Sequence, residues 1–185
     1  MSMFGDGLDK AVQRSFTRPV PKSAGARMRY LVKQLKGTGA VAQMLRISQR
    51  TVERYVKDQI KKPRPDLAGR LEAEVKKRWQ PQIRARARER AATTDGIVID
   101  TRARLGYTAP VGTTDQDRIR HLTVALPPQY AARLFDARQA GATDQRLQQI
   151  AAEALRDVYF QDGGRRAGSL EEVRFTDVEH IEFDL

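Results

Sequence analysis

The sequence predicts an α+β protein that is mostly helical and built from two halves. Apolar residues recur at three- and four-residue spacing through much of the first half, as they do on one face of a helix. Around residue 122, apolar and polar residues alternate instead, which is the period of a half-buried strand. The charge also changes, because residues 1–92 have a net charge of +15 and residues 93–185 have a net charge of −4. We therefore expect a domain boundary near residue 92.

Composition indicates the class of partner. A formal net charge of +11, with every lysine at or before Lys77, favours binding to a polyanion by release of counterions. A membrane surface is the rival polyanion, but the sequence has no apolar run of about 18 residues and no apolar core of a signal peptide. The chain has no cysteine, and its two histidines are far apart in sequence. We expect a cytoplasmic, nucleoid-associated protein that binds no metal or cofactor itself.

Residues 1–24 are expected to form a flexible arm. They contain glycines and prolines with few large apolar residues, which leaves room for one short helix over residues 8–16. Residues 27–35 follow as a supporting helix that ends at Gly37, and its apolar face consists of Met28, Leu31, Val32 and Leu35.

The segment over residues 39–57, GAVAQMLRISQRTVERYVK, fits a helix-turn-helix motif. Ala42 and Leu45 form an apolar stripe on a first helix, and Ile47 falls in a tight turn. Ser48 is well placed to cap a second helix by accepting a hydrogen bond from an unpaired backbone N–H. The inward face of the second helix consists of Val52, Tyr55 and Val56.

The outward face of the second helix favours DNA binding. A recognition helix presents its N-terminal residues to base edges in the major groove, where Arg and Gln make bidentate contacts with guanine and adenine. The alternative is an ordinary amphipathic helix pair with a solvated basic face. The residues expected to contact DNA here are Ser48, Gln49, Arg50, Thr51, Arg54 and Lys57.

Basic residues continue as far as the expected end of this domain. We place the whole domain at residues 25–92. A long helix is predicted over residues 67–79, and Pro81 separates it from an arginine-rich helix over residues 83–92. That second helix is too polar all round to pack in a core, so it is expected to lie along phosphates or to order only on contact with nucleic acid. The KKPRP run resembles a nuclear-localisation signal, although such a run is more typical of a connector or a phosphate contact. The further expected DNA contacts are Lys61, Lys62, Arg64, Arg84, Arg86 and Arg88.

The pattern of residues 93–185 predicts a strand–helix–helix domain. A short strand is expected over residues 96–100, a loop over residues 105–118 and a second strand over residues 121–126. Pro127 and Pro128 start a helix that ends at Gly141, and Thr143 or Asp144 caps the next helix. The alternating tail VRFTDVEHIEFDL is a possible added strand.

About 40 residues of this half resemble the ribbon-helix-helix pattern, in which strands from two chains pair and the helices interlock. Because a strand with one apolar face needs a partner, the pattern predicts a homodimer or a partner-docking domain. The side chains expected to pack between two chains are those of Leu122, Val124 and Leu126.

Several longer strings carry a more specific resemblance, and they extend over essentially the whole chain. They are MSMFGDGLDKAVQ, FTRPVPKSAGARMRYLVKQLKG, SQRTVERYVKDQ, KKRWQPQIRARARER, RLGYTAPVGTTD, RHLTVALPPQYAARLFDA and VYFQDGGRRAG. Together these strings resemble the telomere-protecting terminal proteins (Tpg) of the linear chromosomes and plasmids of streptomycetes.

The resemblance implies a protein that is covalently joined to the 5′ ends of linear DNA and primes filling of the 3′ overhang. In the family the linking residue is a threonine in the loop before the strand–helix–helix segment, which corresponds here to Thr114, with Thr113 as the near alternative. The implied partners are telomeric DNA, a telomere-associated protein and a DNA polymerase, which supplies divalent metal (Mg²⁺). The chain itself would act as the nucleotide acceptor.

Other functions remain open on the residues alone. Without the resemblance, Thr113-Thr114-Asp115 is typical of a turn with an N-cap threonine. By chemistry alone, Tyr107 is another acceptable alcohol. A non-covalent DNA-binding regulator or partition-type adaptor is the alternative function. A self-sufficient nucleotidyltransferase would require a cluster of metal-binding carboxylates, which the pairs Asp115/Asp117 and Glu171/Glu172 are too generic to establish.

Overall fold

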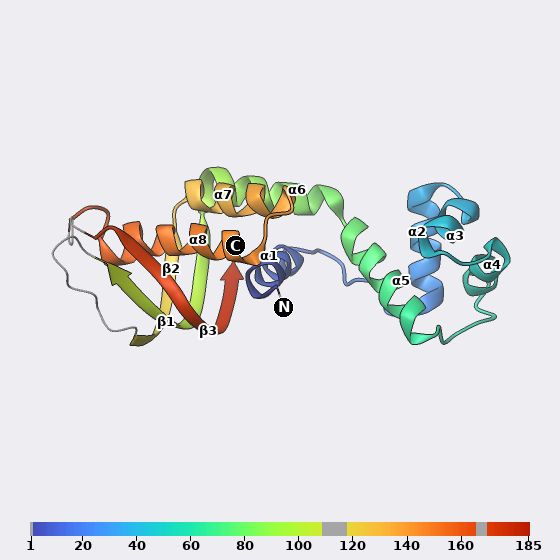
Figure 1. The fold of residues 1–185 in the computed structure, drawn as a ribbon. Coiled ribbons are helices and arrows are strands. Elements are labelled where there is room, and N and C mark those ends of the chain that lie inside the picture. Colours follow the sequence, from blue (N-terminus) through green and yellow to red (C-terminus); the bar gives the residue numbers. More distant parts are fainter. Residues whose placement is uncertain (1, 109–117, 166–169) are drawn as a thin grey trace. The chain divides into compact units, whose positions relative to one another are not determined.

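The computed structural model describes residues 2–108, 118–165 and 170–185, and the chain divides into two compact units (Figure 1). Unit 1 contains Met1–Phe16 together with Gln82–Leu185, and unit 2 contains Thr17–Pro81. Unit 2 is thus inserted within the chain of unit 1. The fold is mixed α+β and mostly helical, which confirms the predicted class. The division differs from the expected boundaries after residues 24 and 92, which followed composition rather than packing.

Unit 2 is a group of four helices, α2 (Ala24–Leu35), α3 (Thr38–Leu45), α4 (Gln49–Val56) and α5 (Pro65–Arg78). Helix α2 begins at Ser23, whose hydroxyl accepts a hydrogen bond from the backbone N–H of Ala26 at 3.2 Å. The helices enclose one apolar core, since their inward side chains repeat at helical spacing. This core contains Ala24, Met28, Leu31, Val41, Ala42, Leu45, Val52, Tyr55, Leu67, Leu71 and Val75.

Residues just after α5 hold part of the segment that was expected to be flexible. The indole Nε1 of Trp79 donates to the carbonyl of Arg18 at 3.1 Å, and its ring packs against Tyr30 with centroids 4.7 Å apart. Gln80 accepts a hydrogen bond from the backbone N–H of Thr17 and donates one to its hydroxyl, both at 3.1 Å. Residues 17–18 therefore belong to unit 2.

The first residues form helix α1 (Met3–Arg14), which packs in unit 1. Phe4 and Leu8 are buried, and the Phe4 ring lies 5.5 Å from that of Phe175 in an edge-on contact. A Cβ at Gly7 would meet the Phe183 ring at 3.1 Å, so the glycine lets this helix approach its neighbour closely. The expectation of a flexible arm is thus wrong for this segment, because its glycines serve helix packing rather than a loop.

Unit 1 contains a three-stranded antiparallel sheet of β1 (Ile97–Thr108), β2 (Arg118–Leu126) and β3 (Glu172–Asp184), in the order β2-β1-β3. The tail is therefore a strand, as its alternation indicated. Strand β1 is longer than the predicted strand over residues 96–100. Its last residues, expected in a loop from residue 105, pair with β3, because Leu105 lies opposite Phe175 and is fully buried.

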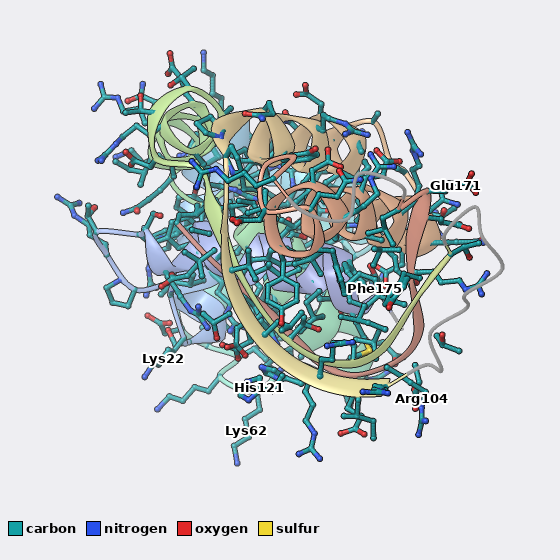
Figure 2. The ribbon with its side chains drawn as sticks, turned by 90° about the vertical axis from the view of Figure 1, so that its left-hand side faces the viewer. Lys22, Lys62, Arg104, His121, Glu171 and Phe175 are labelled. Carbon is teal, nitrogen blue, oxygen red and sulfur yellow. The ribbon has the colours of Figure 1, made fainter. Side chains whose placement is uncertain are left out.

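Helices α7 (Pro128–Gln139) and α8 (Asp144–Leu155) follow β2, and α8 is capped by Thr143, one of the two predicted cap residues. The described part of the unit also contains α6 (Pro81–Arg90) and the π-helical turns η1 (Ala91–Asp95) and η2 (Arg156–Phe160). In the described part of the chain, no helix combines the length and apolar character that crossing a membrane requires. Figure 2 shows Phe175 directed toward the helices, whereas His121 and Arg104 point away from them.

The apolar side of β2 is covered within its own chain. Leu122 and Leu126 are 8% and 2% exposed and belong to the core that α1, α7 and α8 share with the sheet. The strand was expected to bury these side chains against a second chain. Their burial within one chain removes that physical reason for a homodimer.

Candidate nucleic-acid interface

Helices α3 and α4 are joined by a short, tightly bonded turn. Arg46 ends α3 in the left-handed conformation with φ of 53°, and the backbone N–H of Ile47 donates to the carbonyl of Ala42 at 3.0 Å. Ser48 then begins α4, since its hydroxyl accepts from the backbone N–H of Thr51 at 3.2 Å and lies 2.8 Å from the Thr51 hydroxyl. These bonds fix the direction of α4 relative to α3, and they engage both hydroxyls in the helix cap.

The outward side of α4 presents two arginines one turn apart. Arg50 and Arg54 are exposed, and in the residues that the structure describes neither guanidinium makes a hydrogen bond or ion pair. Gln49 is also exposed, but its amide donates to Thr38 Oγ1 at 3.0 Å and Glu53 Oε1 at 3.2 Å. Lys57 lies exposed at the end of the helix.

The inward side of the same helix agrees with the predicted face. Val52 is fully buried, Tyr55 is 4% exposed and Val56 is partly buried. Burial raises the pKa of the Tyr55 phenol. Because the inward face is fixed by the core, the arginines of α4 must face solvent.

The connector from α4 to α5 adds positive charge to unit 2. Lys61, Lys62 and Arg64 are all exposed there, as expected for phosphate contacts or a solvated connector. The nearby carboxylate of Asp58 is paired with Arg29 at 2.7 Å, which partly offsets its negative charge. The connector therefore adds three exposed positive charges to unit 2.

The arginines of α6 belong to unit 1, although the sequence placed them with the DNA-binding half. Arg86 is exposed, whereas Arg84 and Arg88 are partly buried. The Arg88 guanidinium lies 6.0 Å from the centre of the Phe135 ring, and its Nε is buried without a hydrogen bond within the described ranges. Burial and the charge of Arg84 lower the pKa of Arg88. Arg88 thus packs against α7.

Thr113 and Thr114 lie outside the described residues. They belong to residues 109–117, the segment that connects β1 to β2, and the last described pair before it is Leu105 opposite Arg118. Tyr107 of β1 is partly buried, with its ring 6.0 Å from that of Phe160. The hydroxyl alternatives of this region are therefore a threonine in the connecting segment and a tyrosine held on a strand.

The sequence did not predict an aromatic and arginine cluster beside this segment. The Arg120 guanidinium lies 5.5 Å from the centre of the Phe160 ring, which contacts the Tyr159 ring at 5.1 Å and an interplanar angle of 89°. Tyr159 continues the apolar spacing of α8, yet it is 42% exposed. The π-helical turn η2 is the reason, because its wider turn shifts the helical phase of the residues after Leu155.

The register also brings together the two histidines, 59 positions apart in sequence. His121 and His180 lie with their Nε2 atoms 3.4 and 3.5 Å from one oxygen of Asp100, while Thr123 donates to the other at 2.5 Å. The hydrogen bond from Thr123, with the two histidines, lowers the pKa of Asp100. Within the described part of the chain, no cluster of histidine and acidic side chains is suited to hold a metal ion.

No family model, curated protein or solved structure matches this chain. The resemblance to the terminal proteins therefore rests on the sequence strings themselves. The exposed face of α4 comes from the fold of this chain.

Proposed function

We propose that this chain is a terminal protein of linear DNA, joined to the 5′ end through the hydroxyl of Thr114, with Thr113 as the near alternative. The observation that carries the proposal is the string RLGYTAPVGTTD, which resembles the linking segment of that family. Its position supports the proposal, because the string runs from β1 into residues 109–117, which join two paired strands. A hydroxyl at a strand connection is suited to enter the active site of another protein.

The proposed reaction is a nucleotidyl transfer. The Oγ of Thr114 attacks the α-phosphorus of a deoxynucleoside triphosphate, and a phosphate ester bond forms as the bond to the leaving pyrophosphate breaks. The hydroxyl proton passes to a base in the polymerase site. The partner DNA polymerase supplies the divalent metal ions (Mg²⁺) and their carboxylates, so this chain contributes only the alcohol and its placement. The 3′-hydroxyl of the attached nucleotide then primes the filling of the overhang.

In this proposal α3 and α4 of unit 2 act as a DNA-reading helix-turn-helix. Arg50 and Arg54 would contact base edges in the major groove, and the connector lysines would contact phosphates. A telomere-associated protein would also bind the overhang. The working location is accordingly the nucleoid, at the ends of the replicon.

A second function is a non-covalent DNA-binding regulator or partition-type adaptor. It is favoured by one specific observation, because the exposed arginine face of α4 needs no covalent chemistry to bind DNA. The two functions differ in whether a nucleotide becomes attached to the chain.

Labelling of the chain with a nucleotide tests the proposal. The chain is incubated with labelled deoxynucleoside triphosphate, Mg²⁺, DNA polymerase and a telomeric template. We expect Thr114→Ala to abolish labelling while the chain stays folded, because the attacking oxygen is lost. Thr114→Ser should keep part of the labelling, since its hydroxyl remains.

Thr113→Ala and Tyr107→Phe are the matched controls and should leave labelling unchanged. Continued labelling of Thr114→Ala would show that the assignment of Thr114 is wrong. Labelling that is lost only in Thr113→Ala would move the role to Thr113. A wild-type chain that binds DNA but stays unlabelled with an active polymerase would favour the regulator.

A further inference from the structure

The aromatic and arginine cluster of unit 1 lies at the end of the sheet where residues 109–117 connect the strands. The register places Arg118 opposite Leu105 and Arg120 opposite Ala103, so all four side chains share one side of the sheet. Ala103 and Leu105 are buried, and Arg120 contacts Phe160. This cluster of Tyr107, Arg118, Arg120, Tyr159 and Phe160 thus lies on the helix side of the sheet.

The cluster is more exposed than an extension of the core would be. Tyr159 is 42% exposed, and within the described residues it is the one aromatic side chain among the large exposed apolar residues. Its edge-on contact with Phe160 holds the ring in place while leaving part of its surface accessible to a ligand. Arg118 is also exposed. The nearby carboxylate of Asp157 is hydrogen-bonded by Tyr130 and Arg156.

We propose that this cluster binds single-stranded DNA, with a base stacked on Tyr159 and the backbone phosphates held by Arg118 and Arg120. Every base offers a flat π-face to an aromatic ring, and arginine adds charge and stacking, so this pair of residue types suits single strands. Bases of an intact duplex are already stacked and cannot lie on a surface ring. The exposed arginines of α4 are placed for a duplex groove instead.

The inference rests on the proposed function and deepens it. The polymerase can copy the 3′ overhang from the nucleotide on the priming threonine only if a template base lies beside that nucleotide. The cluster flanks the connecting segment through Tyr107 on one strand and Arg118 on the other. A single strand bound there would lie on the two strands that residues 109–117 join in the sequence.

Photo-crosslinking on the full chain tests the inference. The probe is a single-stranded oligonucleotide carrying 5-iodo-deoxyuridine, and crosslinked peptides are identified by mass spectrometry. We expect a crosslink at Tyr159 that Tyr159→Phe retains, because the ring remains. Tyr159→Leu keeps an apolar side chain without the ring and should lower crosslinking in unit 1 about tenfold.

Ile119→Ala is the matched control, since Ile119 is 48% exposed and lies opposite Arg104, which points away from the helices (Figure 2). It should leave crosslinking unchanged. Crosslinks confined to residues 17–81, or equal crosslinking of Tyr159→Leu and the wild type, would overturn the inference. Unchanged crosslinking together with lost binding of polymerase to Tyr159→Leu would also overturn it, in favour of a protein-docking surface.

The crosslinking assay tests the single-strand site, and the labelling assay tests the priming function independently of it. Thr114→Ala should crosslink as the wild type does, because the proposed single-strand site does not use that hydroxyl. If the wild-type chain crosslinks at Tyr159 but takes no label, the single-strand site is supported and the priming function is contradicted. If it takes label at Thr114 but does not crosslink at Tyr159, the priming function is supported and the single-strand site is contradicted.

Discussion

Arg50 and Arg54 are the side chains on which DNA binding by unit 2 depends most in our account. Each is exposed on α4, opposite buried Val52. We predict that Arg50→Ala and Arg54→Ala each weaken binding to the target duplex by about 1–3 kcal/mol, because a base contact is lost. Arg146→Ala, which removes an exposed arginine of unit 1, is the control and should have little effect.

The measurement is a binding titration by fluorescence anisotropy at several salt concentrations. A base contact should relax sequence preference, whereas a phosphate contact should weaken all sequences alike and reduce the salt slope by about 1. Affinity that is unchanged in both α4 variants would contradict the recognition-helix role.

Tyr130 makes the stability of unit 1 sensitive to alkaline pH. Burial and the hydrogen bond to Asp157 raise the pKa of its phenol from 10.0 to about 12. The folded chain therefore keeps the phenol neutral where the unfolded chain would ionise it. This contribution is fully present below pH 10 and is lost as the pH rises to about 12.

We therefore predict that the free energy of unfolding of the wild type falls by roughly 2–3 kcal/mol more than that of Tyr130→Phe across this interval. Denaturant titrations of both proteins at stepwise pH values measure the difference. Parallel pH profiles for the two proteins would show that the phenol is not protected by folding.

The direction of a side chain could be predicted from the sequence where the periodicity of a single helix determines it. The spacing of Val52 and Tyr55 fixes the outward direction of Arg50, so that side chain could be placed from the sequence. Arg88 and Tyr159 could not be placed in this way. The packing of Arg88 on Phe135 joins distant segments, and the exposure of Tyr159 follows a change of helical phase in η2.

Gly96 is the position where one element depends on a glycine. It ends η1 with φ of 74°, and an added Cβ would lie 2.2 Å from the carbonyl oxygen of Leu126 in β2. We predict that Gly96→Ala destabilises unit 1 by about 2 kcal/mol or more, because both the backbone conformation and the close contact forbid a side chain.

Gly141→Ala is the control, since Gly141 also has a positive φ, of 77°, but its added Cβ would meet nothing within 4 Å. Chemical unfolding followed by circular dichroism gives both values. The difference between the two variants reports the steric contact together with the extended positive-φ backbone of Gly96, whose ψ is −156°. Equal destabilisation of the two would mean that the approach of Leu126 contributes nothing.

The elements of unit 2 were predictable because each has a local signal. Ser48 caps α4 and Pro65 starts α5, and the apolar spacing between them is helical. The end of β1 lacked such a signal. Leu105–Thr108 are held in a strand by pairing with β3, about 70 positions later in the sequence, which no local pattern reveals.

At the scale of the whole chain, composition and packing divide the protein differently. The basic stretch extends to residue 92, but unit 2 ends at Pro81 and α6 belongs largely to unit 1. Helix α1 joins unit 1 although 65 residues of unit 2 separate it from Gln82. The charge of a segment indicates its proposed partner. The unit to which a segment belongs depends instead on which apolar faces pack together.

The central claim is a covalent bond between Thr114 and DNA, and mass spectrometry of the protein recovered from its own cells tests it most directly. Genomic DNA is purified under denaturing conditions and digested with nuclease, and the released chain is digested and analysed. We predict that the peptide containing residues 105–118 carries the mass of a nucleotide, with fragmentation placing it on Thr114. Recovery of this peptide only in its unmodified form would contradict the claim.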